Sequence, residues 1–345
     1  MRHDNDVTAV PVTFTAMPPP PVTIILPVFN EAETIDGTLT SLIEQDYAGS
    51  LDVIVADGGS TDGTREKLER WADSTANITV IDNDRRVQSY GLNAAAEASG
   101  APFLVRADGH THYAADYVRQ SVNTVIETGA AAGGRMNPVG TNPFGRAVAA
   151  AMNSRLTMGP ARFHHADRRE QVDTVYLGAF PREDFLQLGG FRAFPSGAAE
   201  DADFYHRWNR TGRTVVVDPV IHSEYTPRQD PRALWSQYFR YGLGKSEMLW
   251  INGRLPSPRP LAPAVLVVGL TSTALAGTIT RKWWPFLLGL GSWLTVVGTV
   301  AIRSRESIAR VMAAAMIMHT SYGLGVLQGL VRGPRAVAYL KEESR

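Results

Sequence analysis

Acidic side chains stand at three places in this sequence, each just beyond a predicted strand or at the start of a predicted helix. They are Asp57, Asp108 with His110, and Glu200 with Asp201. Carboxylates can bind a cation or accept a proton, and ligands of an open α/β sheet bind beyond the carboxyl ends of its strands. Asp57 and Asp108 are therefore expected to converge at one edge of such a sheet.

The triplet Asp108-Gly109-His110 combines a hard carboxylate with an imidazole, and the intervening glycine permits a turn. Such a pair can hold Mg²⁺ or Mn²⁺ beside a diphosphate while leaving positions open for phosphate oxygens. Asp is also common in ordinary turns, so the triplet alone has a structural interpretation as well. Its surroundings must decide between the two.

Glu200 and Asp201 open a predicted helix over 200–210, where acidic side chains are stabilised by the helix dipole. In the functional interpretation, Asp201 is a general base that faces an acceptor hydroxyl. Asp203 lies four residues before Arg207, so these two side chains are expected to pair on one face of the helix.

A later helix, predicted over 234–249, carries Gln237, Arg240 and Tyr241 on one face. An arginine there is suited to binding a diphosphate, and an aromatic ring to stacking on an acceptor sugar. The alternative is a membrane-proximal helix whose Arg240 extends toward the interface.

The elements that must position these residues alternate between strand and helix, which predicts a doubly wound, mainly parallel sheet with flanking helices. Strands are predicted at 22–27, 51–57, 78–81, 103–107, 175–180 and 214–217. Helices are predicted after Glu31 as far as Gln45, and at 65–72, 89–98, 116–127, 183–188, 200–210 and 234–249. Gly58 lets the backbone approach a ligand closely. The stretch 133–169 has no clear periodicity and is interpreted as an excursion over the substrate site.

The composition narrows the class of protein. Lys plus Arg and Asp plus Glu are equal at 34 each in 345 residues, so no global charge favours nucleic acid as a partner. Cysteine is absent, which excludes disulfides, thiolate chemistry and cysteine-ligated metal. Residues 1–21 lack the apolar core of a signal peptide and are predicted to form a disordered arm, with the soluble part in the cytoplasm.

Residues 256–345 have the composition of a membrane region that follows a proline-rich linker at 256–260. Two uncharged runs, at about 261–280 and 285–302, are long enough to span a bilayer. Basic residues before the first run and after the second both favour the cytoplasm, so a hairpin in the cell (inner or plasma) membrane is predicted. The third apolar segment, at about 308–331, is interpreted as interfacial or spanning. Burial of these helices within a soluble protein is the alternative.

Five segments in this order resemble glycosyltransferase family 2: ILPVFNEAETI, VIVADGGSTDGT, VRADGH, AEDADFYHR and QYFRYG. The similarity runs from about Val22 to Lys245. The D-x-H variant, the YTPR run ending at Arg228 and the apolar tail look most like the succinoglycan-biosynthesis type of membrane glycosyltransferase.

The resemblance implies a GT-A fold over 22–255, a UDP-sugar donor and a divalent metal. It also implies site roles. Asp57 lies near the nucleobase, Pro27 and Glu31 flank the nucleotide, and Gly58 contributes to the nucleotide-sugar site. Asp108 and His110 lie at the ribose, diphosphate and metal, and Asp201 is the general base beside Glu200. His110 stands where the family usually has a second Asp, and His222 is a candidate for a further ligand. Tyr241 replaces a Trp of processive relatives, which argues against polymer synthesis through a channel.

The leading hypothesis is an inverting transferase, with its catalytic domain in the cytoplasm, that moves a sugar from a nucleotide donor to a lipid-linked saccharide in exopolysaccharide or envelope synthesis. The second is a polyprenyl-phosphate glycosyl synthase, whose acceptor is the lipid phosphate. A non-enzymatic alternative is an inactive nucleotide-sugar-binding membrane scaffold.

Overall fold

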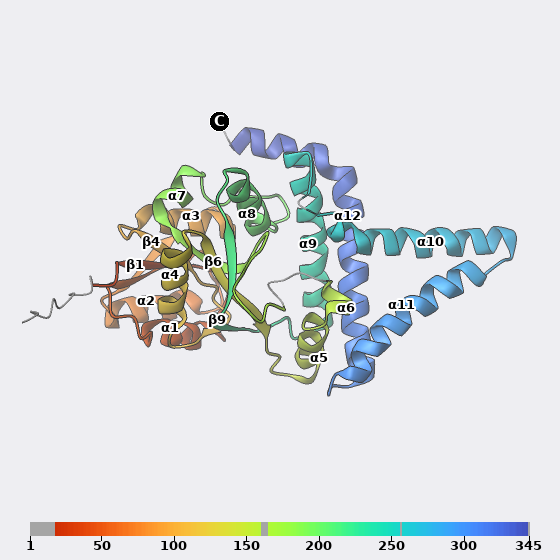
Figure 1. The fold of residues 1–345 in the computed structure, drawn as a ribbon, viewed down its shortest axis with the longest axis horizontal. Helices are drawn as coiled ribbons and strands as arrows, with labels where there is room; N and C mark the ends of the chain where they lie inside the picture. Colours follow the sequence, from red (N-terminus) through yellow and green to blue (C-terminus); the bar gives the residue numbers. More distant parts are fainter. Residues whose placement is uncertain (1–17, 160–164, 256, 344–345) are drawn as a thin grey trace, which may run out of the picture.

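The structure, a computed structural model, describes residues 18–159, 165–255 and 257–343. Most of the arm predicted at residues 1–21 therefore lies outside the described part. Figure 1 shows a sheet with helices on both faces, a central pair of long helices, and two further helices that project away from the sheet.

The first half of the sheet is parallel, as predicted. Strands β1 (Val22–Val28), β2 (Leu51–Asp57), β3 (Ile78–Asp82) and β4 (Phe103–Arg106) lie in the order β3-β2-β1-β4. Ile24 of β1 packs into one apolar cluster and its neighbour Ile25 into another on the opposite face. Strand β1 and most of β2 and β4 are buried on both faces, which is why their sequences are continuous apolar runs, whereas the edge strand β3 is partly exposed. Along the chain, these strands alternate with the helices α1 (Ile35–Ile43), α2 (Thr64–Ser74) and α3 (Gln88–Ala98).

The second half of the sheet is mixed. The strands are β5 (Thr111–Tyr113), β6 (Ala131–Pro138), β7 (Glu170–Gln171), β8 (Tyr176–Pro181) and β9 (Val215–Tyr225). Strand β8 runs antiparallel to both β4 and β6, and β6 runs parallel to β9. The helices here are α4 (Tyr117–Thr128), α5 (Pro143–Met152), α6 (Arg155–Met158), α7 (Arg182–Gln187) and α8 (Glu200–Arg210).

The stretch 133–169 is interpreted from the sequence as an excursion, but its first residues belong to strand β6. The sequence does not predict this strand, because Ala-Ala-Gly-Gly contains no β-branched residue. A Cβ on Gly134 would lie 2.2 Å from the backbone oxygen of Ile221 on β9. The glycine is thus required by close backbone approach, and only the paired strand explains it.

Helix α9 (Pro231–Asn252) leads to a short 3₁₀ turn, Arg259–Leu261, and then to α10 (Ala262–Thr280), α11 (Trp284–Arg303) and α12 (Ile308–Glu343). Among the described residues, two helices are long and apolar enough to cross a membrane: Arg259–Thr280 and Trp284–Arg303, each with mean hydropathy 1.7. They fit the predicted hairpin and project away from the sheet in Figure 1.

Helix α12 lies alongside α9 over several turns, as Figure 1 shows, and continues beyond the predicted residue 331 to Glu343. Glycines let the two backbones meet: a Cβ on Gly325 would lie 2.1 Å from the carbonyl oxygen of Phe239, and one on Gly242 would lie 2.1 Å from that of Tyr322. The helix that carries the predicted acceptor residues is therefore held directly against the C-terminal region.

Candidate active site

One cavity of about 1520 Å³ lies between the carboxyl edge of the parallel strands, the start of α8, helix α9 and helices α10 to α12. It is lined by ten of the residues predicted from the sequence: Pro27, Glu31, Gly58, Asp108, His110, Glu200, Asp201, Gln237, Arg240 and Tyr241. Residues separated by more than two hundred positions in the chain thus share one space.

Asp57 is the predicted site residue that does not line this cavity. Its side chain is only 2% exposed, and it accepts a hydrogen bond of 2.6 Å from the Ser60 hydroxyl. Nη1 of Arg65 lies 3.6 Å from its other oxygen. In the structure, Asp57 therefore stabilises the turn that places Gly58 at the cavity. Its contact with a nucleobase stays a prediction.

The loop that carries Glu31 is fixed by the turn after β2. The backbone N–H groups of Asn30 and Glu31 donate to the hydroxyls of Ser60 and Thr64, each at 2.9 Å. A turn follows, in which the Thr34 N–H donates to the Glu31 carbonyl at 3.0 Å, and α1 begins at Ile35 rather than directly after Glu31.

Glu31 in turn contacts His110, whose Nδ1 lies 3.0 Å from Oε1 of the carboxylate. A carboxylate that accepts from Nδ1 leaves Nε2 as an unprotonated donor atom for a metal, the usual arrangement for a metal-binding histidine. The Tyr225 ring packs edge-on at 5.5 Å from the His110 ring and limits its rotation. This pairing of Glu31 with His110 was not predicted.

Asp108 is buried and receives two contacts on the same oxygen. Nε of Arg106 and Nε2 of Gln88 both lie 3.3 Å from Oδ1. Within the described chain no hydrogen bond reaches Oδ2 of Asp108 or Nε2 of His110.

One carboxylate oxygen and one imidazole nitrogen therefore remain for a cation. No group of three or more His, Cys, Asp or Glu side chains in the described chain could hold a metal by itself. The donor set fits a divalent ion whose other ligands come from a diphosphate and water. His222, the candidate for a further ligand, is exposed on β9 and does not line the cavity.

Glu200 and Asp201 are positioned by a strained turn. Ala199, which precedes them, has φ of 71°, a left-handed conformation that costs a non-glycine residue on the order of 1 kcal/mol. Helix α9 supports this turn: Glu247 accepts from the backbone N–H of Ser196 at 3.2 Å, and a Cβ on Gly244 would lie 2.7 Å from the carbonyl oxygen of Ala198. The acidic pair thus depends on a helix that follows it in the chain.

The carboxylates at the start of α8 have different partners. Asp201 lines the cavity and accepts from the backbone N–H of Ala202 at 2.6 Å. Asp203 is fully buried and binds Arg207 at 2.7 Å, as expected from their spacing, and also Asn252 of α9 at 2.8 Å. Asp203 therefore has a structural role, while Asp201 is available to a ligand.

Glu200 is buried and lies 3.4 Å from the guanidinium of Arg106. Burial and the adjacent charge of Asp201 raise the pKa of Glu200 to about 7, although Arg106 opposes the shift. Arg106 therefore links the predicted metal side of the cavity, through Asp108, to the acidic pair.

We expect the Glu200→Gln variant to gain stability relative to the natural protein as the pH rises from 5 to 8. Because the pKa of Glu200 is raised on folding, its contribution to the free energy of unfolding falls between about pH 4.5 and pH 7. A glutamine does not titrate, so the difference between the two proteins should change by about 2 kcal/mol. Thermal unfolding of both proteins in detergent at the two pH values measures it, and a pH-independent difference would contradict the raised pKa.

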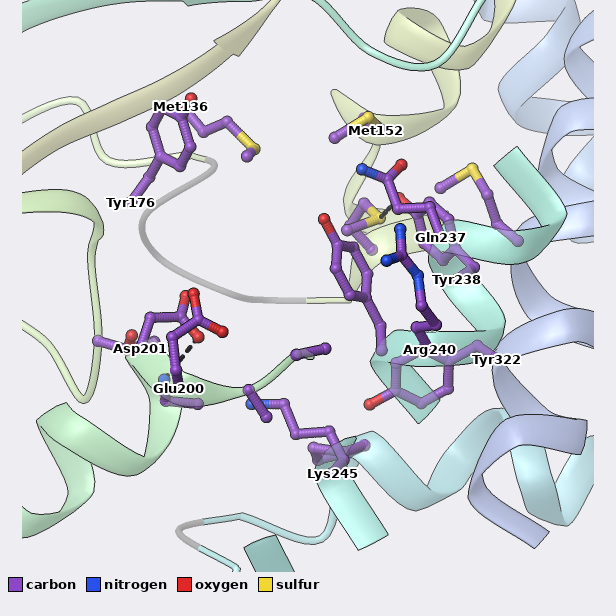
Figure 2. Close-up of a pocket in the computed structure, with 18 of the residues that line it drawn as sticks. Met136, Met152, Tyr176, Glu200, Asp201, Gln237, Tyr238, Arg240, Lys245 and Tyr322 are labelled. Atoms are coloured by element: carbon purple, nitrogen blue, oxygen red, sulfur yellow. Dashed lines mark hydrogen bonds between the residues drawn. The ribbon is translucent and has the colours of Figure 1, made fainter. Parts of the chain in front are cut away.

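Helix α9 contributes the residues predicted to contact the acceptor. Gln237 is buried and donates to the Tyr225 hydroxyl at 3.0 Å, so it has a local partner. Arg240 and Tyr241 are exposed toward the cavity. Figure 2 shows Arg240 and Lys245 on one side of the open space and Glu200 and Asp201 on the other.

Several cavity residues were not predicted from the sequence: Arg86, Gln88, Arg228, Lys245 and Arg259. Lys245 follows Gln237 by eight positions and Tyr241 by four, so helical periodicity places it on the same face. The sequence therefore contains enough information to predict Lys245 as a cavity residue. Arg259 lies in the proline-rich segment between helices, where spacing carries no such information.

Comparison with known proteins places this architecture in a family. The profile described as "Glycosyl transferase family 2" matches residues 23–179. The chain is 30% identical over 326 residues to "Succinoglycan biosynthesis protein ExoA" of Rhizobium meliloti, with 91% of this chain and 96% of that protein covered. It is 27% identical to "Glycosyltransferase AglE" of Haloferax volcanii, over 72% of this chain and 80% of that one.

Among solved structures, the chain resembles the mannosyltransferase PcManGT from Pyrobaculum calidifontis in complex with GDP-Man and Mn²⁺. The TM-score is 0.55 at 19% identity, with 91% of this chain and 87% of that one covered, so the likeness concerns the GT-A fold. Together with the match to the succinoglycan protein over nearly its whole length, these findings show that the chain is a glycosyltransferase and belongs to glycosyltransferase family 2.

Proposed function

We propose that this glycosyltransferase moves one sugar, with inversion, from a UDP-sugar to a lipid-linked saccharide in exopolysaccharide or cell-envelope glycan synthesis. The observation that carries the proposal is the single cavity. It contains the Asp108–His110 pair, the Glu200–Asp201 pair and the polar face of α9, and it continues between the apolar helices α10 and α11. A soluble donor and a membrane-borne acceptor can both reach such a space.

Asp201 is the proposed general base. It takes the proton of the acceptor hydroxyl as that oxygen attacks the anomeric carbon, and the bond to the nucleotide diphosphate breaks on the opposite face. Attack from the face opposite the leaving group inverts the anomeric configuration. Glu200 and Arg106 also line the cavity and set the charge around Asp201.

Asp108 and His110 are the proposed ligands of Mg²⁺ or Mn²⁺, which when bound would neutralise charge on the leaving diphosphate. Glu31 orients His110 for this role through its bond to Nδ1. Pro27 and Gly58, with backbone atoms at the sheet edge, are proposed to flank the nucleotide. Two solved glycosyltransferases of similar fold, PcManGT and GalNAc-T7, contain Mn²⁺.

A membrane location supports the choice of acceptor. We propose that residues 22–255 form the catalytic domain and that 256–345 attach it to the cell membrane from the cytoplasmic side. Arg254 and Arg259 precede α10, while Arg303, Arg305 and Arg310 surround the end of α11, so both ends of the hairpin favour the cytoplasm.

A polyprenyl-phosphate glycosyl synthase is the second candidate. A relative from Methanococcus voltae is 23% identical over 66% of this chain and is named "Dolichyl N-acetyl-alpha-D-glucosaminyl phosphate 3-beta-D-2,3-diacetamido-2,3-dideoxy-beta-D-glucuronosyltransferase". That name describes a lipid-linked sugar as the acceptor, which supports the first candidate over this one.

The test is to incubate membranes that contain the full chain with a panel of radiolabelled nucleotide sugars, with and without EDTA. We expect one UDP-sugar to label a lipid-extractable product, and EDTA to remove at least about nine-tenths of the labelling. Mild acid should release an oligosaccharide one residue longer than the acceptor. A released monosaccharide would instead support the polyprenyl-phosphate synthase, and retention of the donor's anomeric configuration would exclude the inverting mechanism.

A further inference from the structure

Four basic side chains line the cavity on the side of α9 and the membrane helices: Arg228, Arg240, Lys245 and Arg259. None of the four forms an ion pair with any residue that the structure describes, whereas Arg106 on the opposite side contacts both Asp108 and Glu200. Cations gathered around a cavity without protein counter-charges are arranged as for an anionic ligand.

Lys245 is the cation of this group that lies nearest the acidic pair in Figure 2, where Arg240 is the other one labelled. It is half-buried on α9 and, as Figure 2 shows, reaches toward Glu200 and Asp201. Burial lowers the pKa of Lys245, and the charges of Asp201, Glu200 and Asp203 oppose that shift. No direct bond joins the ammonium to these carboxylates among the described contacts. A ligand that passes between them would meet the base on one side and this cation on the other.

The far end of the cavity is apolar and lies among the C-terminal helices. It is lined by Leu266 of α10, Trp293 and Val296 of α11, and Met318 of α12. Trp293 donates to Nδ1 of His319, and Nε2 of His319 lies 3.0 Å from the carbonyl oxygen of Thr157, so α11, α12 and α6 are tied together around this end. Arg259, in the 3₁₀ turn that leads into α10, lines the same cavity.

The volume of the cavity is also larger than one small-molecule ligand would occupy. Small-molecule sites occupy roughly 300–1,000 Å³. The cavity measures about 1520 Å³, and its acidic and basic linings face each other across it. A nucleotide diphosphate with its metal suits the side of Asp108 and His110, which leaves the basic side for a second anion.

We propose that Arg240, Lys245 and Arg259 form a subsite for the diphosphate of an isoprenoid-type lipid, with its hydrocarbon chain between α10, α11 and α12. The inference rests on the proposed function and deepens it by naming the acceptor's head group and the residues that hold it. Several cations favour a diphosphate over a monophosphate, because each added phosphate charge gains a charge-assisted hydrogen bond. The acceptor sugar then extends from the diphosphate toward Asp201.

The test measures binding of radiolabelled farnesyl diphosphate to the purified full chain in mild detergent, with UDP and Mn²⁺ present at saturation. We expect binding that UDP does not displace, and weaker binding of farnesyl monophosphate, inorganic diphosphate and farnesol. Lys245→Gln and Arg259→Gln should each weaken the affinity for farnesyl diphosphate by about tenfold or more. Their affinity for UDP should stay within about twofold of the natural value, because that site is distinct.

Lys282→Gln is the matched control, since it removes the same charge from the exposed turn between α10 and α11, outside the cavity. It should leave the affinity unchanged, and Lys245→Arg should restore most of it. Complete displacement of farnesyl diphosphate by UDP would overturn the proposal, because the cations would then serve the donor. Equal binding of farnesol, or unaltered affinity in both glutamine variants, would also overturn it.

The outcome is separable from that of the proposed function because the measurement needs no sugar transfer. Binding as expected in a chain that transfers no sugar from any donor would refute the proposed function and leave the subsite standing. Transfer to a lipid-linked acceptor with an unchanged KM in the Lys245→Gln variant would refute only the subsite.

Discussion

The Asp201→Asn variant is expected to lose about 10³-fold in turnover while it keeps its affinity for the nucleotide donor. An asparagine preserves the shape of the side chain but cannot take the proton of an attacking hydroxyl, and general-base catalysis contributes roughly 10²- to 10⁴-fold. Asp201 faces the cavity, and its described hydrogen bond comes from the backbone of its own helix, so folding should not suffer. Initial rates with the donor identified in the panel, together with UDP binding, provide the measurement.

Two other carboxylates serve as comparisons. Asp203→Asn should lower the thermal stability, because it weakens the contacts of a fully buried charge with Arg207 and Asn252. Asp73→Asn, on the exposed face of α2, should change neither rate nor stability. If Asp201→Asn retains the natural rate, another group must be the base, and Glu200 becomes the first candidate.

Replacement of Asp108 by Asn is expected to weaken Mn²⁺-dependent binding of UDP by at least about 100-fold. Even partners that only orient metal ligands contribute 10- to 100-fold to metal affinity, so the loss of a ligand oxygen should have at least the larger effect. Asn retains an oxygen for Gln88 and Arg106, but it removes the charge that Arg106 and a divalent ion would share. Calorimetric titration of UDP with and without Mn²⁺ measures this effect.

The neighbouring histidines provide a control for the same site. His110→Asn should lose much of the Mn²⁺ dependence, whereas His112→Asn, exposed on β5 and outside the cavity, should retain it. Should the natural protein bind UDP equally well with and without Mn²⁺, the metal site at Asp108 and His110 would be refuted. Arg106 would then be the group that balances the diphosphate.

Some residues that line the cavity could be predicted from local sequence patterns. The strands that end near Gly58 and Asp108 were predictable because buried parallel strands are continuous apolar runs bounded by turns. Glu200 and Asp201 were predictable as a helix start. Since both signals depend only on neighbouring residues, they can be recognised in the sequence without knowledge of the rest of the fold.

Contacts between distant segments were not predictable in the same way. Asp57 carries the same side chain and lies at a similar strand end as Asp108, yet Ser60 and Arg65 enclose the first, while the second faces the cavity. Similarly, nothing in the spacing of Asp201 and Asp203 shows which one meets Asn252 of α9 and is buried. Which charge is neutralised depends on the groups that folding brings within hydrogen-bonding distance.

The amino-acid sequence by itself determined the family, the parallel half of the sheet, the apolar hairpin and most of the acidic cavity residues, since each of these rests on periodicity or on a local motif. Tertiary structure decided the pairing of Glu31 with His110, the strand β6 with its glycines against β9, and the packing of α12 along α9. It also decided that Lys245 and Arg259 line one cavity and form no ion pair with any residue in the part of the chain that the structure describes. These features depend on which distant surfaces meet in the fold. The free energy of such contacts cannot be inferred from any short stretch of the chain.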